Sequence, residues 1–385
     1  MNFDLTDDQQ LLGDSLSRLL RAEYGFDQRR LHAAQADGWS RTIWRKFGEL
    51  GLLGLPFTQD DGGFGCGPIE TMVVMEAFGG ALVIEPYLTS VVLAGSVIAA
   101  SLPTPQRSAL IAGIVDGSHI AAFAHSEADS GYDLTSVHTT ATHTENGWRL
   151  DGTKCIVLHG DSADTIVVSA RIADAAELPG ELALFVMPAS AAGITRHGYP
   201  TQDGMRAADI GLDGVLLPDD ARLDVADPAG VVIEQAFEVT IAALCAEAIG
   251  AMQAALDLTV EYLKTREQFG RPLGTLQALQ HQAADLFICL EQARSMTFYV
   301  TMMLATDDRY TRRRAVAAAK LLIGRLGRTL GQRAIQLHGG VGMTDEYSVS
   351  HYFKRLTMID QMFGDFNHHE IALAEMGGLF EASTG

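Results

Sequence analysis

Cysteine is scarce in this 385-residue chain, and its copies lie far apart. They include no CxxC pair, and they stand at Cys66, Cys155, Cys245 and Cys289. This usage argues against a disulfide framework and a zinc ribbon, and it predicts a reducing, cytoplasmic environment. Metal-binding spacings such as HExxH are also missing, so we expect no metal site.

Basic residues are few as well. The chain has 28 Lys and Arg against 48 Asp and Glu, which gives a formal net charge of −20. Nucleic acid and anionic membrane surfaces carry charge of the same sign, so we expect neither as a main partner. A small anionic ligand remains compatible, because a few arginines and helix N-termini can bind it locally.

Leader and membrane segments are not evident in the sequence. The first eight residues contain neither the basic nor the apolar region of a secretory signal, so we expect no signal peptide. The most apolar run, residues 239–256, is rich in alanine and contains Glu247 and Gln253. We therefore expect no membrane span.

Proline is nearly absent from residue 229 onwards. Ten of the eleven prolines lie at or before Pro228, and the last is Pro272. A long stretch without proline, enriched in Ala, Leu, Met and Arg, predicts long helices. We expect these helices at about 231–266, 276–305 and 312–338.

Short runs of strand-forming residues occupy the middle of the chain, separated by turn signals such as Asn146-Gly. Leucines recur at helical spacing before them, so the order is helices, strands, then long helices. This order predicts an α+β chain in three parts rather than an alternating βαβ fold. We place the boundaries at 1–118 for an N-terminal helical domain, 119–228 for a central β domain and 229–385 for a C-terminal helical bundle.

Two glycine-containing segments follow predicted helices, Arg266-Glu-Gln-Phe-Gly and Gln336-Leu-His-Gly-Gly-Val-Gly-Met. Glycines at a helix end let backbone N–H groups approach an anion closely, and a guanidinium suits a diphosphate. Taken singly, each segment is better explained by structure alone, with Gly339, Gly340 and Gly342 as a helix C-cap and Arg266 as a surface ion-pair residue.

Together with three further segments, these motifs resemble the acyl-CoA dehydrogenase family in family order and over nearly the whole chain. The further segments are Pro56-Phe-Thr-Gln-Asp-Asp-Gly-Gly-Phe-Gly, Ser126-Glu and Asp151-Gly-Thr-Lys. The resemblance implies an N-terminal helical domain, a central β-barrel-like domain and a C-terminal four-helix bundle. It also implies FAD bound between domains and across a dimer interface.

The resemblance assigns FAD contacts to particular residues. Those expected to reach a neighbouring subunit's FAD are Arg266, Gln268 and Phe269. Further contacts from the bundle are expected at Gln277, Gln336, Leu337, Gly339 and Gly340. Ser126, Val157 and Leu158 are expected to face the flavin ring, although the family's glycine-rich turn Thr-Glu-Pro-Gly-x-Gly-Ser-Asp reads Ser126-Glu-Ala-Asp-Ser-Gly-Tyr-Asp here.

The implied reaction removes two hydrogens from an acyl-CoA thioester and passes the electrons to an electron-transferring flavoprotein. A carboxylate takes the proton from Cα, and hydride leaves Cβ for flavin N5. The usual loop position of that carboxylate is occupied here by Gly364. The alternative helix position is occupied by Thr240, with Ile241 in place of a neighbouring arginine.

Two nearby carboxylates remain as candidate catalytic bases. Glu247 lies two helical turns beyond Thr240 and is the only charged residue in its apolar run. Such a carboxylate is either a functional acid or is neutralised by a buried partner. Asp365 stands one residue from the usual loop position, and its shorter side chain would need a shifted loop.

The missing base resembles a bacterial branch of the family that works as heteromeric pairs, typified by the small subunit of pimeloyl-CoA dehydrogenase. This implies a sister subunit in a heterotetramer, with a homo-oligomer as the alternative. The chain could instead be a non-catalytic partner that completes a sister subunit's FAD site, or a flavin monooxygenase on the same fold. Gly364 further predicts extra space that suits a bulky, branched or dicarboxylic acyl group.

Overall fold

A computed structural model describes residues 5–173 and 180–377 of the chain. The backbone divides into two compact units, each of which is built from separate stretches of sequence. Unit 1 contains Met1–Leu31, Pro68–Val83 and Ile241–Gly385, and unit 2 contains His32–Gly67 and Ile84–Thr240. The segment predicted as the N-terminal domain therefore contributes to both units.

Unit 2 is built on a seven-stranded sheet with the order β1-β4-β2-β3-β7-β6, in which β5 also pairs with β4. The strands β1 and β2 run parallel to β4, and the other pairs are antiparallel. The bounds are β1 Ala121–Ala124, β2 Thr140–Thr144, β3 Gly147–Leu158, β4 Thr165–Ile172, β5 Leu182–Pro188, β6 Ile194–Pro200 and β7 Arg206–Leu217.

Local sequence explains these strands. The turn predicted at Asn146-Gly joins β2 to β3, where Thr144 pairs with Gly147. The strand β5 is a continuous apolar run, and both β4 and β5 are largely buried. The pairing of β3 with β7 shifts register twice, and the second shift lies between Lys154 and Val157. That bulge breaks the alternation of side chains along β3.

Helices accompany the sheet within unit 2. The π-helix η3 packs against β1, and the Ser90 hydroxyl accepts a hydrogen bond from the backbone N–H of Ala121. The bounds of these helices are α3 Arg41–Glu49, η3 Tyr87–Ala94, α5 Gly95–Ala99 and α6 Pro105–Val115, with short 3-10 turns at Leu52–Gly54, Gln59–Asp61 and Asp219–Ala221.

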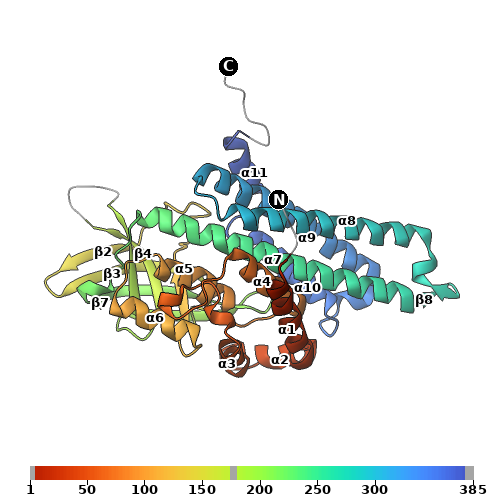
Figure 1. Ribbon diagram of the computed structural model, residues 1–385, viewed down its shortest axis with the longest axis horizontal. Coiled ribbons are helices and arrows are strands. Elements are labelled where there is room, and N and C mark those ends of the chain that lie inside the picture. The colour runs from red at the N-terminus through yellow and green to blue at the C-terminus, as the bar shows by residue number, and fades with distance from the viewer. Residues whose placement is uncertain (1–4, 174–179, 378–385) are drawn as a thin grey trace, which may run out of the picture. The chain divides into compact units, whose positions relative to one another are not determined.

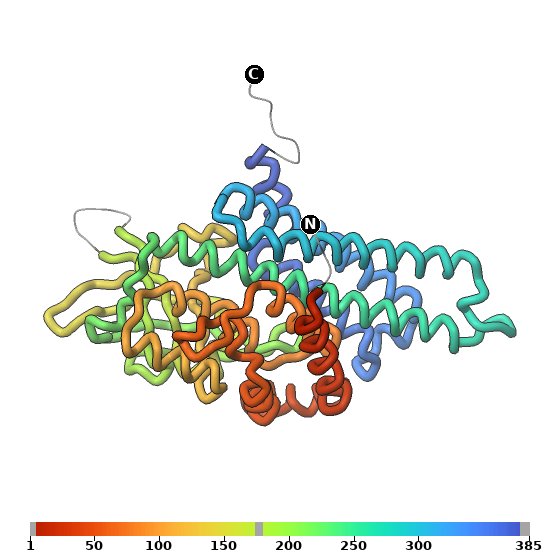
Figure 2. The backbone as a smooth tube through the Cα atoms, in the orientation of Figure 1, coloured from red at the N-terminus to blue at the C-terminus, as the bar shows by residue number. Residues whose placement is uncertain are grey.

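Unit 1 contains the long helices that the proline-free stretch predicts. The chain reverses direction between α7 and α8 at a short hairpin of two strands, and α8 packs along α9 (Figures 1 and 2). The bounds are α7 Ala229–Thr265, β8 Glu267–Gln268, β9 Arg271–Pro272, α8 Gln277–Met303, α9 Arg309–His338, α10 Val349–Gln361 and α11 Phe366–Glu375. The helices α1 Asp7–Glu23 and α4 Pro68–Ala81 also belong to this unit, whereas α2 Phe26–Ala33 ends just beyond its first stretch and α7 begins before its last.

Glycines bring α4 and α7 into backbone contact. A Cβ on Gly79 would lie 1.9 Å from the carbonyl oxygen of Glu247, and one on Gly250 would lie 1.8 Å from that of Glu76. Only glycine permits so close a crossing. The helix α7 is long and apolar enough to cross a membrane, but 83% of its most apolar window is buried, as in the core helix of a globular protein.

Candidate active site

Glu247, the first candidate base, is engaged by an arginine 108 residues further along the chain. The Arg355 guanidinium on α10 donates to both carboxylate oxygens, from Nε to Oε1 at 2.5 Å and from a terminal nitrogen to Oε2 at 2.7 Å. Glu247 is 3% exposed and Arg355 is 4% exposed. The sequence allowed Glu247 to be either a functional acid or a carboxylate neutralised by a buried partner. The structure shows the buried partner, which is Arg355.

Asp365, the second candidate base, is the N-cap of α11. Its half-buried side chain accepts a hydrogen bond from the backbone N–H of His368 at 2.8 Å. A carboxylate at this position also interacts favourably with the positive end of the helix dipole. Asp365 thus has a local structural role that requires no catalytic function.

Gly364 occupies a loop that leaves no room for a side chain. Its φ is +99°, and a Cβ would lie 2.6 Å from ring atoms of both His368 and His369. The buried Lys320 ammonium donates to the carbonyl oxygens of Asp360 and Gly364 at 2.8 and 2.7 Å. Two imidazoles therefore fill the space next to Gly364 in the direction that a Cβ would take. The prediction of extra space at Gly364 is wrong in that direction.

Burial sets the pKa values around this loop. It lowers the pKa of Lys320 to about 8, and together with the Lys320 charge it lowers the pKa of His369 to about 3. The His369 imidazole is then neutral near pH 7, and its Nε2–H can donate to the carbonyl oxygen of Phe363 at 3.0 Å. The loop is thus fixed from two sides by buried nitrogen donors.

The predicted FAD contacts near residue 266 lie on the β8–β9 hairpin. Phe269 adopts a φ of +54° at its tip, and its side chain is 88% exposed. Arg266 and Gln268 are exposed beside it, and Gln277 is exposed at the start of α8. The Arg266 guanidinium forms no hydrogen bond or ion pair with the residues that the structure describes.

The predicted contacts near residue 337 lie at the C-terminal end of α9. Gln336 is exposed and Leu337 is buried, whereas a Cβ on Gly339 or Gly340 would meet no atom within 4 Å. The His338 ring packs 4.6 Å from the ring of Tyr262 near the end of α7. The structure thus brings the ends of α7 and α9 together, next to the hairpin that carries Arg266.

Three further predicted contacts lie in unit 2, on two segments joined by a hydrogen bond. Ser126 follows β1 and is half-buried, and its carbonyl oxygen accepts from the backbone N–H of Cys155 on β3 at 2.9 Å. Val157 is 2% exposed and points into the core, and Leu158 is half-buried. Ile156, at the bulge, is 59% exposed, so it presents the larger apolar surface.

Ile156 stands out because its φ is +53°, which is costly for a β-branched residue. Its backbone N–H donates to the Asp209 carboxylate at 3.2 Å, and the Tyr199 hydroxyl donates to the same oxygen at 2.9 Å. Burial and the Asp209 hydrogen bond raise the pKa of Tyr199 to about 12, so this hydroxyl keeps its proton. The exposed bulge is thus held by specific polar contacts.

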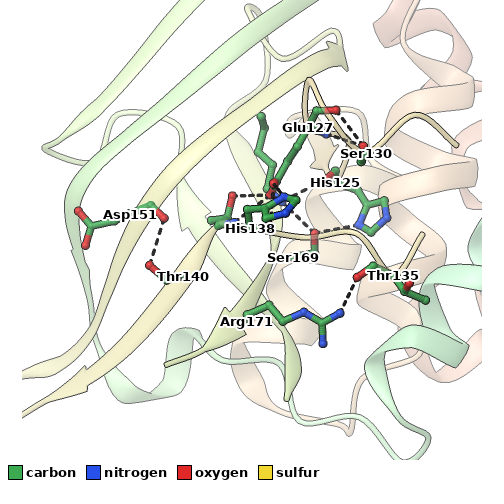
Figure 3. Close-up of polar contacts among 11 residues, drawn as sticks. His125, Glu127, Ser130, Thr135, His138, Thr140, Asp151, Ser169 and Arg171 are labelled. Carbon is green, nitrogen blue, oxygen red and sulfur yellow. Dashed lines mark hydrogen bonds and ion pairs between the residues drawn. The ribbon is translucent and has the colours of Figure 1, made fainter. Parts of the chain in front are cut away.

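A buried charge network that includes Glu127, His125 and Ser169 supports these two segments (Figure 3). The Lys154 ammonium donates to the Glu127 carboxylate at 2.7 Å, to the carbonyl oxygen of His125 at 3.1 Å and to the Ser169 hydroxyl at 3.2 Å. Burial lowers the pKa of Lys154 to about 8, and burial with the Lys154 charge lowers the pKa of His125 to about 3. Although burial raises the pKa of Glu127, its bonds to Lys154 and Thr139 lower it to about 2. Sequence reasoning assigned no role to this pair.

Comparison with known proteins places this arrangement in a family. Models of the acyl-CoA dehydrogenase N-terminal, middle and C-terminal domains match residues 6–118, 122–212 and 230–375. The acyl-CoA dehydrogenase FadE12 of Mycobacterium tuberculosis is 30% identical over 333 residues, which cover 85% of this chain and 84% of that protein. The chain belongs to the acyl-CoA dehydrogenase family.

Two solved acyl-CoA dehydrogenase structures are similar over almost their whole length. The ChsE4–ChsE5 complex from Mycobacterium tuberculosis has a TM-score of 0.87 and 26% identity, with 97% of this chain and 98% of that chain covered. The steroid enzyme Tcur3481–Tcur3483 has a TM-score of 0.84 and 29% identity, with 96% and 97% covered. The three-part fold predicted from the sequence is thereby confirmed.

The residues of this acyl-CoA dehydrogenase fit the FAD that its family uses. The exposed Arg266 guanidinium and the open backbone at Gly339 and Gly340 are donors suited to a diphosphate. The exposed ring of Phe269 and the side chain of Ile156 are apolar surfaces suited to an aromatic ring system. The enzyme is thus an FAD-dependent oxidoreductase that acts on acyl-CoA.

Proposed function

We propose that this acyl-CoA dehydrogenase works as one subunit of a heteromeric enzyme that desaturates an acyl-CoA and passes the electrons to an electron-transferring flavoprotein. One observation carries the proposal. The usual base positions hold Gly364 and Thr240, and the two nearby carboxylates, Glu247 and Asp365, are engaged by Arg355 and by α11. A sister subunit with its own base would complete the reaction.

Exposed residues at the end of the helical bundle support an assembly. The hairpin and the turn after α9 present large apolar side chains to solvent, with Phe269 at 88%, Met343 at 75% and Val341 at 38% exposed. Grouped apolar exposure of this kind marks a surface that a partner covers. We propose that Arg266, Gln268 and Phe269 bind the FAD of a neighbouring subunit there.

The remaining cofactor contacts follow from the same proposal. Gln277, Gln336, Leu337, Gly339 and Gly340 would bind the diphosphate end, with Leu337 acting through its backbone because its side chain is buried. Ser126, Val157 and Leu158 would flank the flavin ring, and bound FAD would supply the acceptor for the hydride. Val157 likewise would act through its backbone.

The relatives support the heteromeric form, because both ChsE4–ChsE5 and Tcur3481–Tcur3483 carry the names of two subunits. We also propose the domain boundaries 1–118, 119–228 and 229–385, which lie close to the limits of the three matching family models. The four free cysteines suit a reducing, cytoplasmic location.

Proton exchange identifies the base independently of the electron acceptor. In D2O, an active base exchanges the Cα proton of a bound acyl-CoA, which mass spectrometry detects. We would compare Glu247→Gln, Asp365→Asn and the double variant in the complex with the product of the neighbouring gene. Unchanged exchange in the double variant supports a base from the sister subunit, and its loss in one single variant assigns the base to that residue.

A non-catalytic partner is the second candidate, and the Glu247–Arg355 ion pair favours it because it engages the remaining helical carboxylate. Purification of this chain alone and together with the neighbouring gene product distinguishes the heteromeric enzyme subunit from the non-catalytic partner. Flavin absorbance gives the FAD stoichiometry, and dye reduction by a panel of acyl-CoAs gives the activity. Flavin retention and turnover by the lone chain would exclude both the obligate heteromer and the non-catalytic partner.

A further inference from the structure

The Lys154 ammonium is fully satisfied at the centre of unit 2. Its three protons reach three acceptors, the Glu127 carboxylate, the His125 carbonyl oxygen and the Ser169 hydroxyl. The side chain of Lys154 is 0% exposed and that of Glu127 is 7% exposed. Both charges of the pair are therefore buried in the folded chain, and the pair is not a surface contact.

Glu127 collects hydrogen bonds from a second direction. Its carboxylate accepts from the backbone N–H and the hydroxyl of Thr139 at 3.0 and 2.7 Å, and from the backbone N–H of His138 at 2.8 Å. His138 and Thr139 lie just before β2, and Lys154 lies on β3. One carboxylate thus ties the segment after β1 to two strands.

Ser130 closes the turn that departs from the family pattern. Its hydroxyl donates to the carbonyl oxygen of Glu127 at 2.8 Å and accepts from the backbone N–H of Glu127 at 3.1 Å. This local ring holds the backbone at Glu127 where the family has a glycine-rich turn. The altered turn therefore depends on Glu127 being fixed.

The network ends at the two segments expected to face the flavin. Ser126 adjoins Glu127 and Cys155 adjoins Lys154, and these two neighbours share the 2.9 Å backbone hydrogen bond. The next residue, Ile156, carries the left-handed φ and the exposed side chain. The Ser126 hydroxyl forms no hydrogen bond within the described part of the chain, which leaves it free for a ligand.

Stability alone does not explain such a pair. Burying two charges costs about as much as their attraction returns, and an apolar pair of similar volume is often as stable or more so. A group that must hold two backbone segments at fixed distance and direction gains more from directional bonds than from apolar packing. Glu127 adjoins Ser126, and Lys154 lies two residues before Ile156 on the strand that is hydrogen-bonded to Ser126, which gives the pair that task.

We propose that Glu127 and Lys154 are positioning residues, whose ion pair fixes Ser126 and the β3 bulge in the arrangement that receives the flavin ring. This inference rests on the proposed FAD contacts in unit 2. It adds two residues that contact no cofactor themselves and act through their neighbours.

Lys154→Met tests the proposal, with Asp61→Asn as its matched control. Asp61 and Arg107 form another buried ion pair in unit 2, with side chains 7% and 9% exposed, and neither residue is among the proposed FAD contacts. We would measure FAD affinity by titration, the flavin absorbance spectrum, and the alkylation rate of Cys155 by peptide mapping. The half-buried Cys289 in unit 1 serves as the reference thiol.

Lys154→Met is expected to weaken FAD binding by roughly tenfold or more, the usual scale for removing a group that orients a direct contact. It is also expected to speed Cys155 alkylation when rates are compared per thiolate, because loss of the Lys154 charge raises the pKa of the Cys155 thiol. Asp61→Asn is expected to lower the melting temperature and leave both readouts unchanged. Equal effects of the two variants would reduce the pair to a general structural role and overturn the proposal.

The double variant Glu127→Gln/Lys154→Met covers the case in which Lys154→Met does not fold. It removes both charges, so its melting temperature should return towards that of the wild type while FAD affinity stays low. Recovery of both quantities would contradict positioning. Failure of the wild-type complex to bind FAD would instead refute the proposed FAD site, which Cys155 alkylation does not measure.

Discussion

Arg355 bonds both carboxylate oxygens of Glu247, and both side chains are almost fully buried. Removing one partner of such a pair leaves an uncompensated charge in the core. Arg355→Met should therefore destabilise the protein by about 3–5 kcal/mol, measured by urea unfolding. The exposed pair Arg325–Glu370 is the control, and Arg325→Met should cost less than about 1 kcal/mol. Equal costs would mean that the buried pair is not formed in solution.

Gly364 is the second residue whose replacement is informative, because it tests whether the loop can accept a side chain at the family's base position. Gly364→Ala places a Cβ against two imidazoles at a φ of +99°, so we expect a loss of stability of roughly 2 kcal/mol or more. Gly364→Glu should be at least as destabilising and should not restore activity. Gly230→Ala, where a Cβ meets nothing within 4 Å, is the control and should change the melting temperature little. A stable, active Gly364→Glu would show that the loop readily accepts the family's carboxylate.

At the scale of elements, the crossing of α4 and α7 depends on single glycines. Gly79→Ala would put a Cβ 1.9 Å from the Glu247 carbonyl oxygen, whereas Gly80→Ala would put one 3.8 Å from that of Gly250. We expect Gly79→Ala to cost roughly 3 kcal/mol or more, because two backbones must separate. Gly80→Ala should be nearly neutral. Thermal unfolding of the two neighbouring variants compares them directly, and similar melting temperatures would argue against the close crossing.

Element boundaries followed closely from local chemistry. The missing prolines predicted helices at 231–266, 276–305 and 312–338, and the structure has them at Ala229–Thr265, Gln277–Met303 and Arg309–His338. Propensity and proline act within a few residues, so a sequence reports them directly. The partner of Glu247 was beyond such reasoning, because Arg355 is 108 residues away and only the packing of α10 on the bundle brings it near.

The same limit applies to the other site residues. The motif that contains Ser126-Glu and the motif that ends at Lys154 were recognised as segments, but the ion pair between them requires the folded sheet. The filling of the space at Gly364 by His368 and His369 depends on how α11 begins. Local sequence indicates which residues belong to a site. The packing of the folded chain decides which of those side chains already bond to another residue.

At the scale of the whole molecule, the charge of −20 disfavours large anions but not FAD or CoA. The exposed guanidinium of Arg266 and the open backbone at Gly339 and Gly340 lie together at one end of the bundle. Two buried lysines, Lys154 and Lys320, are used inside the fold rather than for ligand binding. Arg266 thus supplies positive charge where the family binds its cofactor, whereas Lys154 and Lys320 serve as internal donors.

Buried histidines make the stability of the whole protein depend on pH. The pKa values of His125 and His369 lie at about 3 in the folded state, chiefly because of burial and, less, because of the nearby lysine charges, against an ordinary value of 6.5. The unfolded chain therefore binds more protons between about pH 6.5 and 3, so stability rises with pH in that window and is lost as the solution is acidified. We expect the free energy of unfolding to fall by on the order of 2 kcal/mol or more per histidine between pH 7 and 4.

Urea unfolding at several pH values measures this slope, and His369→Gln isolates one contribution. The variant loses a buried ring and so is less stable at pH 7, but it has no proton to bind at this position. Its free energy of unfolding should consequently fall less steeply than that of the wild type on acidification. His281→Gln, which replaces an exposed imidazole on α8, is the control. If His369→Gln kept the wild-type slope, His369 would not contribute to the loss of stability in acid. That loss would then have to come from His125 and, below about pH 4.5, from carboxylates such as Glu127, whose folded pKa is about 2.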